Sequence, residues 1–411
     1  MGEPERSKAF LRPNPGLPAE PASPAEGPGC PAAAAGDPIT RYLPRSAFSA
    51  DLHRRVDAYF ADTGRARRDQ PRMFLKTAIV LGALVGSYVG LLHATSAGMG
   101  ALLAVALGLS MAAVGFNVQH DGNHGAYSKH RWVNRTAAIS LDLLGGSSYF
   151  WRFKHNIAHH THTNVAGHDT DIGLGGLGRL CPDDPIHPFY RFQHLYVWGL
   201  YAALAIEWQL VGEYRNFARR SFGIIRVPPL PRAEQILFWS ARLGFLVLGF
   251  GLPLLHHGWL FVCLTYLLAS ATLGLTLAVV FQLAHCVGEA DFWDHPIADQ
   301  PAVREWSVHQ VESTVDFARG NGPLCWLLGG LNFQIEHHLF PKVCHVHYPA
   351  LAPIVEAVCR EHGVRYRAHA SVGAALRSHW RWLVAMGRPD PAVPAMAVAV
   401  AAAAAAGAPE A

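Results

Sequence analysis

Three clusters of histidine lie just outside long hydrophobic stretches of this chain. They read His120-x3-His124, His155-x3-His159-His160 and Gln334-x2-His337-His338. Imidazole is a preferred ligand of iron, zinc and copper in proteins. Seven histidines in paired spacing, beside apolar runs long enough to cross a membrane, therefore predict a metal site at the surface of a bilayer.

The spacing within the clusters also indicates how many ions they bind. Residues four apart on a helix lie on one face, with Cβ atoms about 5–6 Å apart, so each such pair is expected to converge on one ion. The two pairs are His120 with His124 and His155 with His159. Adjacent residues point about 100° apart, so a histidine dipeptide should face two neighbouring ions. A dinuclear centre is therefore favoured by both dipeptides, His159-His160 and His337-His338.

The residues around the clusters are specific as well. They read Gln119-His120-Asp121-Gly122-Asn123-His124, then Lys154-His155-Asn156-Ile157-Ala158-His159-His160-Thr161-His162-Thr163-Asn164, and finally Asn332-Phe333-Gln334-Ile335-Glu336-His337-His338-Leu339-Phe340-Pro341. These segments resemble the three histidine boxes of membrane-bound fatty acid desaturases, and the resemblance extends from about Tyr59 to Arg388. Gln334, in place of the first histidine of the third box, resembles the front-end branch of that family.

This resemblance implies an iron enzyme that uses O2. His285, in Gln282-Leu283-Ala284-His285, matches the additional histidine that desaturases carry after their last span. The implied ligands of two iron ions are His120, His124, His155, His159, His160, His285, His337 and His338. A desaturase removes hydrogens from an unactivated methylene, which needs iron, O2 and two electrons because no side chain can do it. Ligand affinity alone would favour copper or zinc, so iron rests on the resemblance.

Groups around the histidines should orient their rings. An all-imidazole site leaves the metal cationic, so hydrogen-bond acceptors are expected behind the ligands. The candidates are Asp121, Asn156, Asn164, Asp169, Asp171 and Glu336. Gln334 is expected to reach a metal directly or through water, and the sequence leaves both open. Other histidines are expected to be packed or solvated, with His162 and His168 as alternative ligands.

The composition is that of a membrane protein. Apolar residues make up 51% of the chain and charged residues 16%, whereas soluble proteins carry about a quarter charged residues. The net charge of +4 is small and does not suggest a nucleic-acid partner. The seven cysteines are scattered and form no CxxC pair, which argues against a disulfide framework or a zinc finger.

One membrane domain between two tails is expected. Residues 1–45 are rich in Pro, Gly, Ala and Glu, which predicts a disordered tail, and the Ala-rich run 391–411 is expected to be a low-complexity tail. The desaturase domain would then cover 46–390. Many front-end desaturases carry a fused cytochrome b5 domain with a His-Pro-Gly-Gly motif, which neither tail contains. No haem is therefore expected in this chain, and a separate donor, ferredoxin or cytochrome b5 with its reductase, would supply electrons.

Four stretches approach the roughly 20 apolar residues that a membrane helix needs. They are 74–92, 99–118, 236–255 and 259–284, joined in pairs by the turns 93–98 and 256–258. Both turns lack Lys and Arg, so the positive-inside rule places the opposite side, with the three clusters, in the cytoplasm. A fifth run, 194–214, is expected to be an interfacial helix, because a crossing there would separate the third cluster from the first two.

The expected fold is an all-α, multi-pass integral membrane protein, with four transmembrane helices in two hairpins and a cytoplasmic helical cap that holds a histidine-rich di-iron site. The leading function is an oxygen-dependent desaturase that inserts a cis double bond into a fatty acyl chain, as acyl-CoA or acyl-lipid. A fatty acyl or sphingolipid hydroxylase on the same scaffold stays an alternative, since one C–H abstraction precedes either outcome. A metal transporter or sensor is less favoured, because transporters place their ligands near the bilayer midplane.

Overall fold

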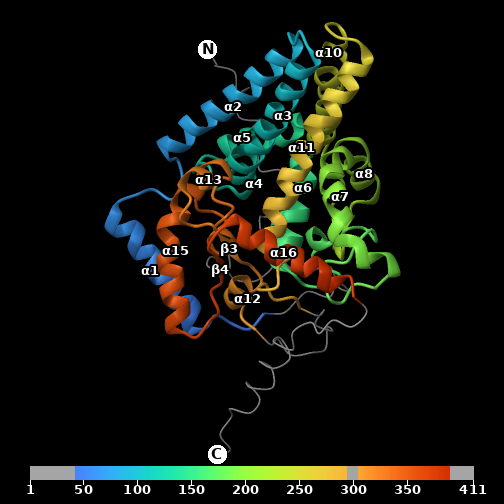
Figure 1. Ribbon diagram of the computed structural model, residues 1–411. Helices are drawn as coiled ribbons and strands as arrows, with labels where there is room; N and C mark the ends of the chain where they lie inside the picture. The colour runs from blue at the N-terminus through green and yellow to red at the C-terminus, as the bar shows by residue number, and fades with distance from the viewer. Residues whose placement is uncertain (1–41, 294–303, 389–411) are drawn as a thin grey trace, which may run out of the picture.

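The computed structural model of the 411-residue chain describes residues 42–293 and 304–388 (Figure 1). The two expected tails lie almost wholly outside these residues, so they stay predictions. Within the described residues the fold is mostly helical, as the sequence predicts, and only two short strand pairs occur. β1 (Ser221–Phe222) pairs antiparallel with β2 (Ile225–Arg226), and β3 (Asp316–Phe317) pairs parallel with β4 (Ala368–His369).

Four helices of the described chain are long and apolar enough to cross a membrane. The first is α2 (Pro71–Leu92), and the second consists of α3 (Ala97–Val114), η2 (Gly115–Gln119) and α4 (His120–His124). The third consists of α9 (Arg232–Leu246), η7 (Val247–Gly251) and α10 (Leu252–Leu254), and the fourth is α11 (Trp259–His285). The prediction of four spans is confirmed. The second is longer than expected, so it carries the first histidine cluster on its end.

The spans present large side chains outward and small residues to one another. Leu102 is 70% exposed and Leu264 is 57% exposed, which suits contact with lipid. α3 packs against both α2 and α11. At Gly108 a Cβ would lie 2.4 Å from the carbonyl oxygen of Ala269, so only glycine allows this approach. Small residues at such contacts are the usual way for membrane helices to pack, because the hydrophobic effect does not drive them together in lipid.

The shorter helices gather where α4 and α11 end, and form a cap on the spans (Figure 1). They are α1 (Ala47–Thr63), α5 (Arg131–Leu143), α6 (Ser148–Trp151), η3 (Arg152–His159), η4 (Thr170–Ile172), η5 (Pro188–Phe192), α12 (Trp306–Glu312), α13 (Gly322–Leu327), α14 (Gln334–Leu339), η8 (His345–His347), α15 (Tyr348–Glu361) and α16 (Val372–Met386). Leu52 of α1 and Val355 of α15 share one buried cluster with Ile335 and Leu339 of α14. Burying each such side chain contributes about 1.5–3 kcal/mol, so this cluster fixes the helix that carries the third histidine cluster.

A long helix outside the four spans packs along α11. It comprises α7 (Gln193–Glu207), η6 (Trp208–Gly212) and α8 (Glu213–Arg219), and it contains the run expected at the membrane interface. It runs antiparallel to α11, since Gly274 lies against Tyr201 and Ala205 while Ser270, one turn earlier, bonds Gln209. Its depth in the bilayer stays a prediction.

Candidate metal centre

Eight histidines from four separate segments meet where the spans enter the cap. Two come from α4, three from η3 and the residue after it, one from the last position of α11, and two from α14. All are buried, with at most 7% of the residue exposed: His120, His124, His155, His159, His160, His285, His337 and His338. These are the eight positions that the sequence predicts as ligands.

The ring nitrogens fall into two neighbouring sets. The first histidine group is His120, His124, His155 and His337, whose ligand atoms all lie within 4.8 Å of one another. The second histidine group is His159, His285 and His338, with the same spacing. His160 lies between the groups, within the same distance of one member of each, His337 and His338. The arrangement has the form expected for a pair of ions.

The expectation that His155 and His159 converge on one ion is wrong. They belong to different groups because the second cluster lies on a π-helical segment, η3, in which the backbone bonds from i to i+5. The wider turn brings His155 to His160, with 3.3 Å between their Nε2 atoms, and leaves His159 pointing to the other group. The expected split of His337 from His338 does occur, since each joins a different group.

The histidines fit a metal pair because several buried nitrogens have no other partner. His124 Nε2, His159 Nε2 and His337 Nε2 have no hydrogen-bond partner among the described residues. The same holds for His160 Nδ1 and His285 Nδ1. An unpaired buried polar atom costs about 1–3 kcal/mol, so five of them at one place fit the ligand atoms of bound cations.

Burial also favours the neutral form of several of these imidazoles. Desolvation, and to a smaller extent repulsion from neighbouring imidazoles, lowers the pKa of His160, His337 and His338 well below the usual value. Desolvation likewise lowers the pKa of His155 to about 3. A neutral ring keeps the lone pair that a metal requires.

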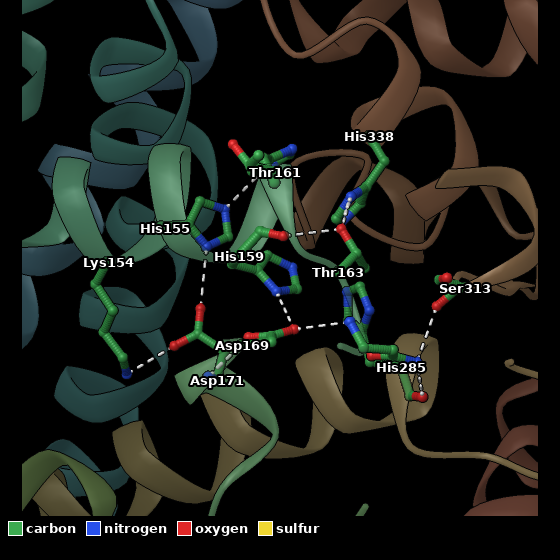
Figure 2. A network of polar contacts seen from close by, with 12 residues as sticks. Lys154, His155, His159, Thr161, Thr163, Asp169, Asp171, His285, Ser313 and His338 are labelled. Atoms are coloured by element: carbon green, nitrogen blue, oxygen red, sulfur yellow. Dashed lines mark hydrogen bonds and ion pairs between the residues drawn. The ribbon is translucent and has the colours of Figure 1, made fainter. Parts of the chain in front are cut away.

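Two rings of the second histidine group are held by close acceptors. His159 Nδ1 donates to Asp169 Oδ2 at 2.8 Å, as Figure 2 shows. His338 Nδ1 donates at 2.8 Å to Gln310 Oε1, on α12. Each bond fixes the tautomer and turns the other nitrogen, Nε2, toward the centre. Asp169 is one of the orienting residues that the sequence predicts, whereas Gln310 is not among them.

Asn164 joins the loop after η3 to the end of α11. Its Nδ2 lies within donating distance of the carbonyl oxygens of His285 at 3.0 Å and Ser313 at 3.1 Å. Its own backbone N–H donates to Asp169 Oδ2 at 3.0 Å. The residue adopts φ 56°, a left-handed conformation that asparagine tolerates better than most residues. Asn164 therefore positions the backbone of one ligand and the carboxylate behind another.

The first histidine group is held more loosely. His155 Nδ1 lies 3.4 Å from Asp171 Oδ2, and Asp171 also pairs with Lys154 Nζ at 2.7 Å (Figure 2). His337 Nδ1 lies 3.4 Å from the hydroxyl of Tyr348. Lys154 and Tyr348 were not predicted, although Lys154 stands directly before His155 in the sequence.

Three of the expected orienting residues act elsewhere. Asp121 Oδ2 accepts from His345 Nδ1 at 3.0 Å, and its other oxygen is 4.0 Å from His120 Nδ1. Glu336 accepts from the Tyr366 hydroxyl at 3.0 Å. Asn156 Nδ2 donates to the carbonyl oxygen of Asn123 at 2.9 Å, which joins the second cluster to the first.

Gln334 lies inside the centre. Its side-chain amide nitrogen is 3.0 Å from His285 Nε2 and 3.5 Å from His338 Nε2. It is 4% exposed and also lines the neighbouring cavity. The residue that replaces the usual histidine therefore stands between the second histidine group and the space beside it.

A mostly apolar cavity of about 220 Å³ opens beside the centre. His120, His155 and Gln334 form part of its wall, and Trp151 stacks on His155 with ring centroids 4.3 Å apart. The rest of the lining comes largely from α7, η6 and α11 and includes Leu204, Leu273 and Leu277. Such a cavity fits a hydrocarbon chain held against the metal ligands.

Four membrane-length helices and a buried multi-histidine centre beside an apolar cavity define a membrane-bound metalloenzyme that acts on hydrophobic substrates. Residues 96–370 match the family model described as fatty acid desaturase. The chain belongs to the fatty acid desaturase family, and it is an oxidoreductase that acts on fatty acyl chains at a lipid membrane.

Three curated relatives support this assignment. The chain is 37% identical over 355 residues to the sn-1 linoleoyl-lipid 6-desaturase of Synechocystis sp., which covers 85% of this chain and 98% of that protein. It is 38% identical over 345 residues to the enzyme of the same name from Arthrospira platensis, covering 82% and 92%. It is 36% identical over 347 residues to the acyl-lipid (8-3)-desaturase of Physcomitrium patens, covering 82% and 71%.

Proposed function

We propose that this protein is a front-end acyl-lipid desaturase that uses O2 to insert a cis double bond between an existing double bond and the carboxyl group. The observation that carries this is the apolar cavity whose wall includes His120, His155 and Gln334. A methylene chain in this cavity would lie directly beside the first histidine group, and Gln334 would stand between the chain and the second group. The acyl-lipid form is favoured over acyl-CoA because the relatives named above act on acyl-lipids.

The eight buried histidines would hold two iron ions, four in the first histidine group, three in the second, and His160 between them. When bound, the iron pair would supply, with O2 and two electrons, the removal of hydrogen from adjacent methylenes. The protein's own groups do the positioning. Asp169 and Gln310 hold the rings of His159 and His338, and the apolar wall excludes water from the chain.

The electrons would come from a separate protein, either ferredoxin or cytochrome b5 with its reductase. The domain that carries out the reaction would span residues 46–390. Its active site would face the cytoplasm, because the two short turns at the other end of the spans lack Lys and Arg.

Expression in a host that contains linoleoyl lipids but lacks this activity tests the proposal. Gas chromatography of the lipids should reveal a new double bond on the carboxyl side of the existing ones, absent with a His337→Ala variant. A hydroxylated product would favour the hydroxylase instead. Metal analysis of active protein should give about two irons per chain, and a value near one would contradict the dinuclear centre.

Sidedness can be measured separately. Single cysteines at Ser96 and at Arg220, in a background without reactive thiols, should be labelled from opposite sides of sealed vesicles. Ser96 precedes α3 at the turn without positive charge, and Arg220 follows α8 in an arginine-rich segment. Labelling of both from one side would refute the four-span arrangement.

A further inference from the structure

The cavity contains a polar side chain, Gln209, in a wall that is mostly apolar. Gln209 is 3% exposed, and its neighbours in the lining include Leu144, Leu204 and Leu273. Burying an amide in apolar surroundings is costly unless it is hydrogen-bonded. The residue therefore needs partners, and the structure provides them from two other elements.

Gln209 ties together three parts of the fold. Its Oε1 accepts from Ser270 Oγ at 3.0 Å and from the Tyr266 hydroxyl at 3.1 Å, both on α11. Its Nε2 donates to the carbonyl oxygen of Leu144, in the loop between α5 and α6, at 3.0 Å. A side chain held by three bonds in this way forms a rigid wall, unlike the leucines around it.

The loop between α5 and α6 is shaped around this side chain. Gly145 adopts φ +94°, and a Cβ there would lie 2.7 Å from Gln209 Cγ. The next residue, Gly146, accepts a hydrogen bond at its carbonyl oxygen from Arg242 Nη1 at 2.8 Å. The backbone of the loop therefore packs directly against Gln209, because its two glycines have no side chain that would occupy this space.

The cavity stops at Gln209 along α11. The lining residues of that helix run from Leu273 to Gln282. Ser270 and Tyr266, further toward the helix start, bond Gln209 and are not part of the lining. The lining of α11 spans about 13 Å from Leu273 to Gln282, so the wall stands at least roughly that far from the level of Gln282, which lies one turn before His285.

Gln209 lies on the π-helical segment η6, and other parts of the cavity wall also lie on π-helical segments. Of the four π segments in the described chain, η2, η3 and η6 contribute lining residues and η7 does not. π-helical turns are rare and are frequent at functional sites. In η6 the wide turn lets the adjacent residues Trp208 and Gln209 both face the cavity.

We propose that Gln209 is a specificity-determining residue: it is the end wall that limits how long an acyl chain can extend past the metal centre. This inference rests on the proposed function. A lipid head group is too polar and bulky for a closed, mostly apolar end, so that end receives the methyl terminus. Gln209 thereby selects the chain length on the methyl side, while the position of the new double bond is fixed at the centre.

A competition assay tests this selectivity. Membranes with wild-type enzyme or Gln209→Ala receive an equimolar mixture of two linoleoyl-type lipids that differ by two methylenes at the methyl end. The ratio of longer to shorter product should rise roughly tenfold in Gln209→Ala, because a methylene in an apolar pocket discriminates on that scale. The double-bond position, counted from the carboxyl group, should not change. Gln209→Asn, which keeps the amide but is one methylene shorter, should give a smaller rise.

Leu200→Ala is the matched control, since Leu200 lines the cavity on the same long helix at the opposite end of its lining residues. The ratio of longer to shorter product in Leu200→Ala should stay within about twofold of the wild-type ratio. Suppose that the product ratio is unchanged in both Gln209 variants, while iron content and turnover of the shorter lipid are retained. That result would refute the role of Gln209 as the end wall but would leave the proposed function standing. An equal shift in Leu200→Ala, or loss of all turnover in both Gln209 variants with iron retained, would refute this role as well. Wild-type enzyme that desaturates neither lipid would overturn the proposed function itself.

Discussion

The two histidine groups of the centre are built differently. In the second group, His159 and His338 are fully buried, and each donates at 2.8 Å to a fixed acceptor. In the first group, His120 and His155 reach the cavity wall, and the acceptor of His155 Nδ1 is 3.4 Å away. We infer that the second group fixes the position of the metal pair. The rings of the first group are held less firmly and can shift on the side where substrate enters.

The largest effect is expected from removing a ligand of the second group. His159→Ala takes away a ring whose Nε2 has no other partner among the described residues, so the neighbouring metal should be lost. Iron should fall to about half, and desaturation should become undetectable, as shown by metal analysis and gas chromatography. His362→Ala, at a partly exposed histidine beside Asp51, should leave both unchanged. Activity that survives His159→Ala would refute the assignment of the second group.

Gln334→Ala should separate metal binding from turnover. The amide touches His285 and His338 but is a weaker metal donor than imidazole, so most of the iron should stay. Turnover should fall about 10–100-fold, as is typical when a partner of a metal ligand is lost. Gln334→His should retain part of the activity, because imidazole fills a similar space. Wild-type turnover in Gln334→Ala would show that the residue has no role at the centre.

The carboxylates behind the rings allow a direct comparison of the two groups. Asp169→Asn removes the acceptor for His159 Nδ1 and for the backbone N–H of Asn164. Iron affinity or activity should fall about 10–100-fold. Titration with a chelator, followed by metal analysis and assay of the recovered protein, measures both.

Asp171→Asn is the matched change in the first group and should have the smallest effect. Its bond to His155 is 3.4 Å long, so it holds that ring less firmly than Asp169 holds the ring of His159 at 2.8 Å. The loss in the same chelator titration should stay below about tenfold. Equal losses in Asp169→Asn and Asp171→Asn would remove the distinction between the two groups.

The sequence predicts the elements of this protein well because its signals are local. Runs of apolar residues indicate all four spans, the histidine clusters indicate seven buried rings of the centre, and the family resemblance adds the eighth, His285. Asp169 and Asn164 are close to the second cluster in the chain, so their proximity to it could be expected. The branch of the family is suggested by a single residue, Gln334.

Other parts of the centre depended on the fold. His155 and His159 separate because η3 winds as a π-helix, and neither residue type nor spacing indicates that winding. Asp121 bonds more closely to His345 than to His120, because the chain returns beside it 224 positions later. Glu336 turns away from the rings toward Tyr366 for the same reason.

The sequence by itself determined which histidines gather at the centre and the four membrane helices, because imidazole chemistry and apolar run length are properties of short segments. The tertiary structure alone decided which ring belongs to which group, that Gln310 holds His338, and that Gln209 closes the cavity. The physical reason is that hydrogen-bond partners and cavity walls are set by distances between elements far apart in the chain. Those distances follow from how α7, α11 and the cap pack together, which no local pattern specifies.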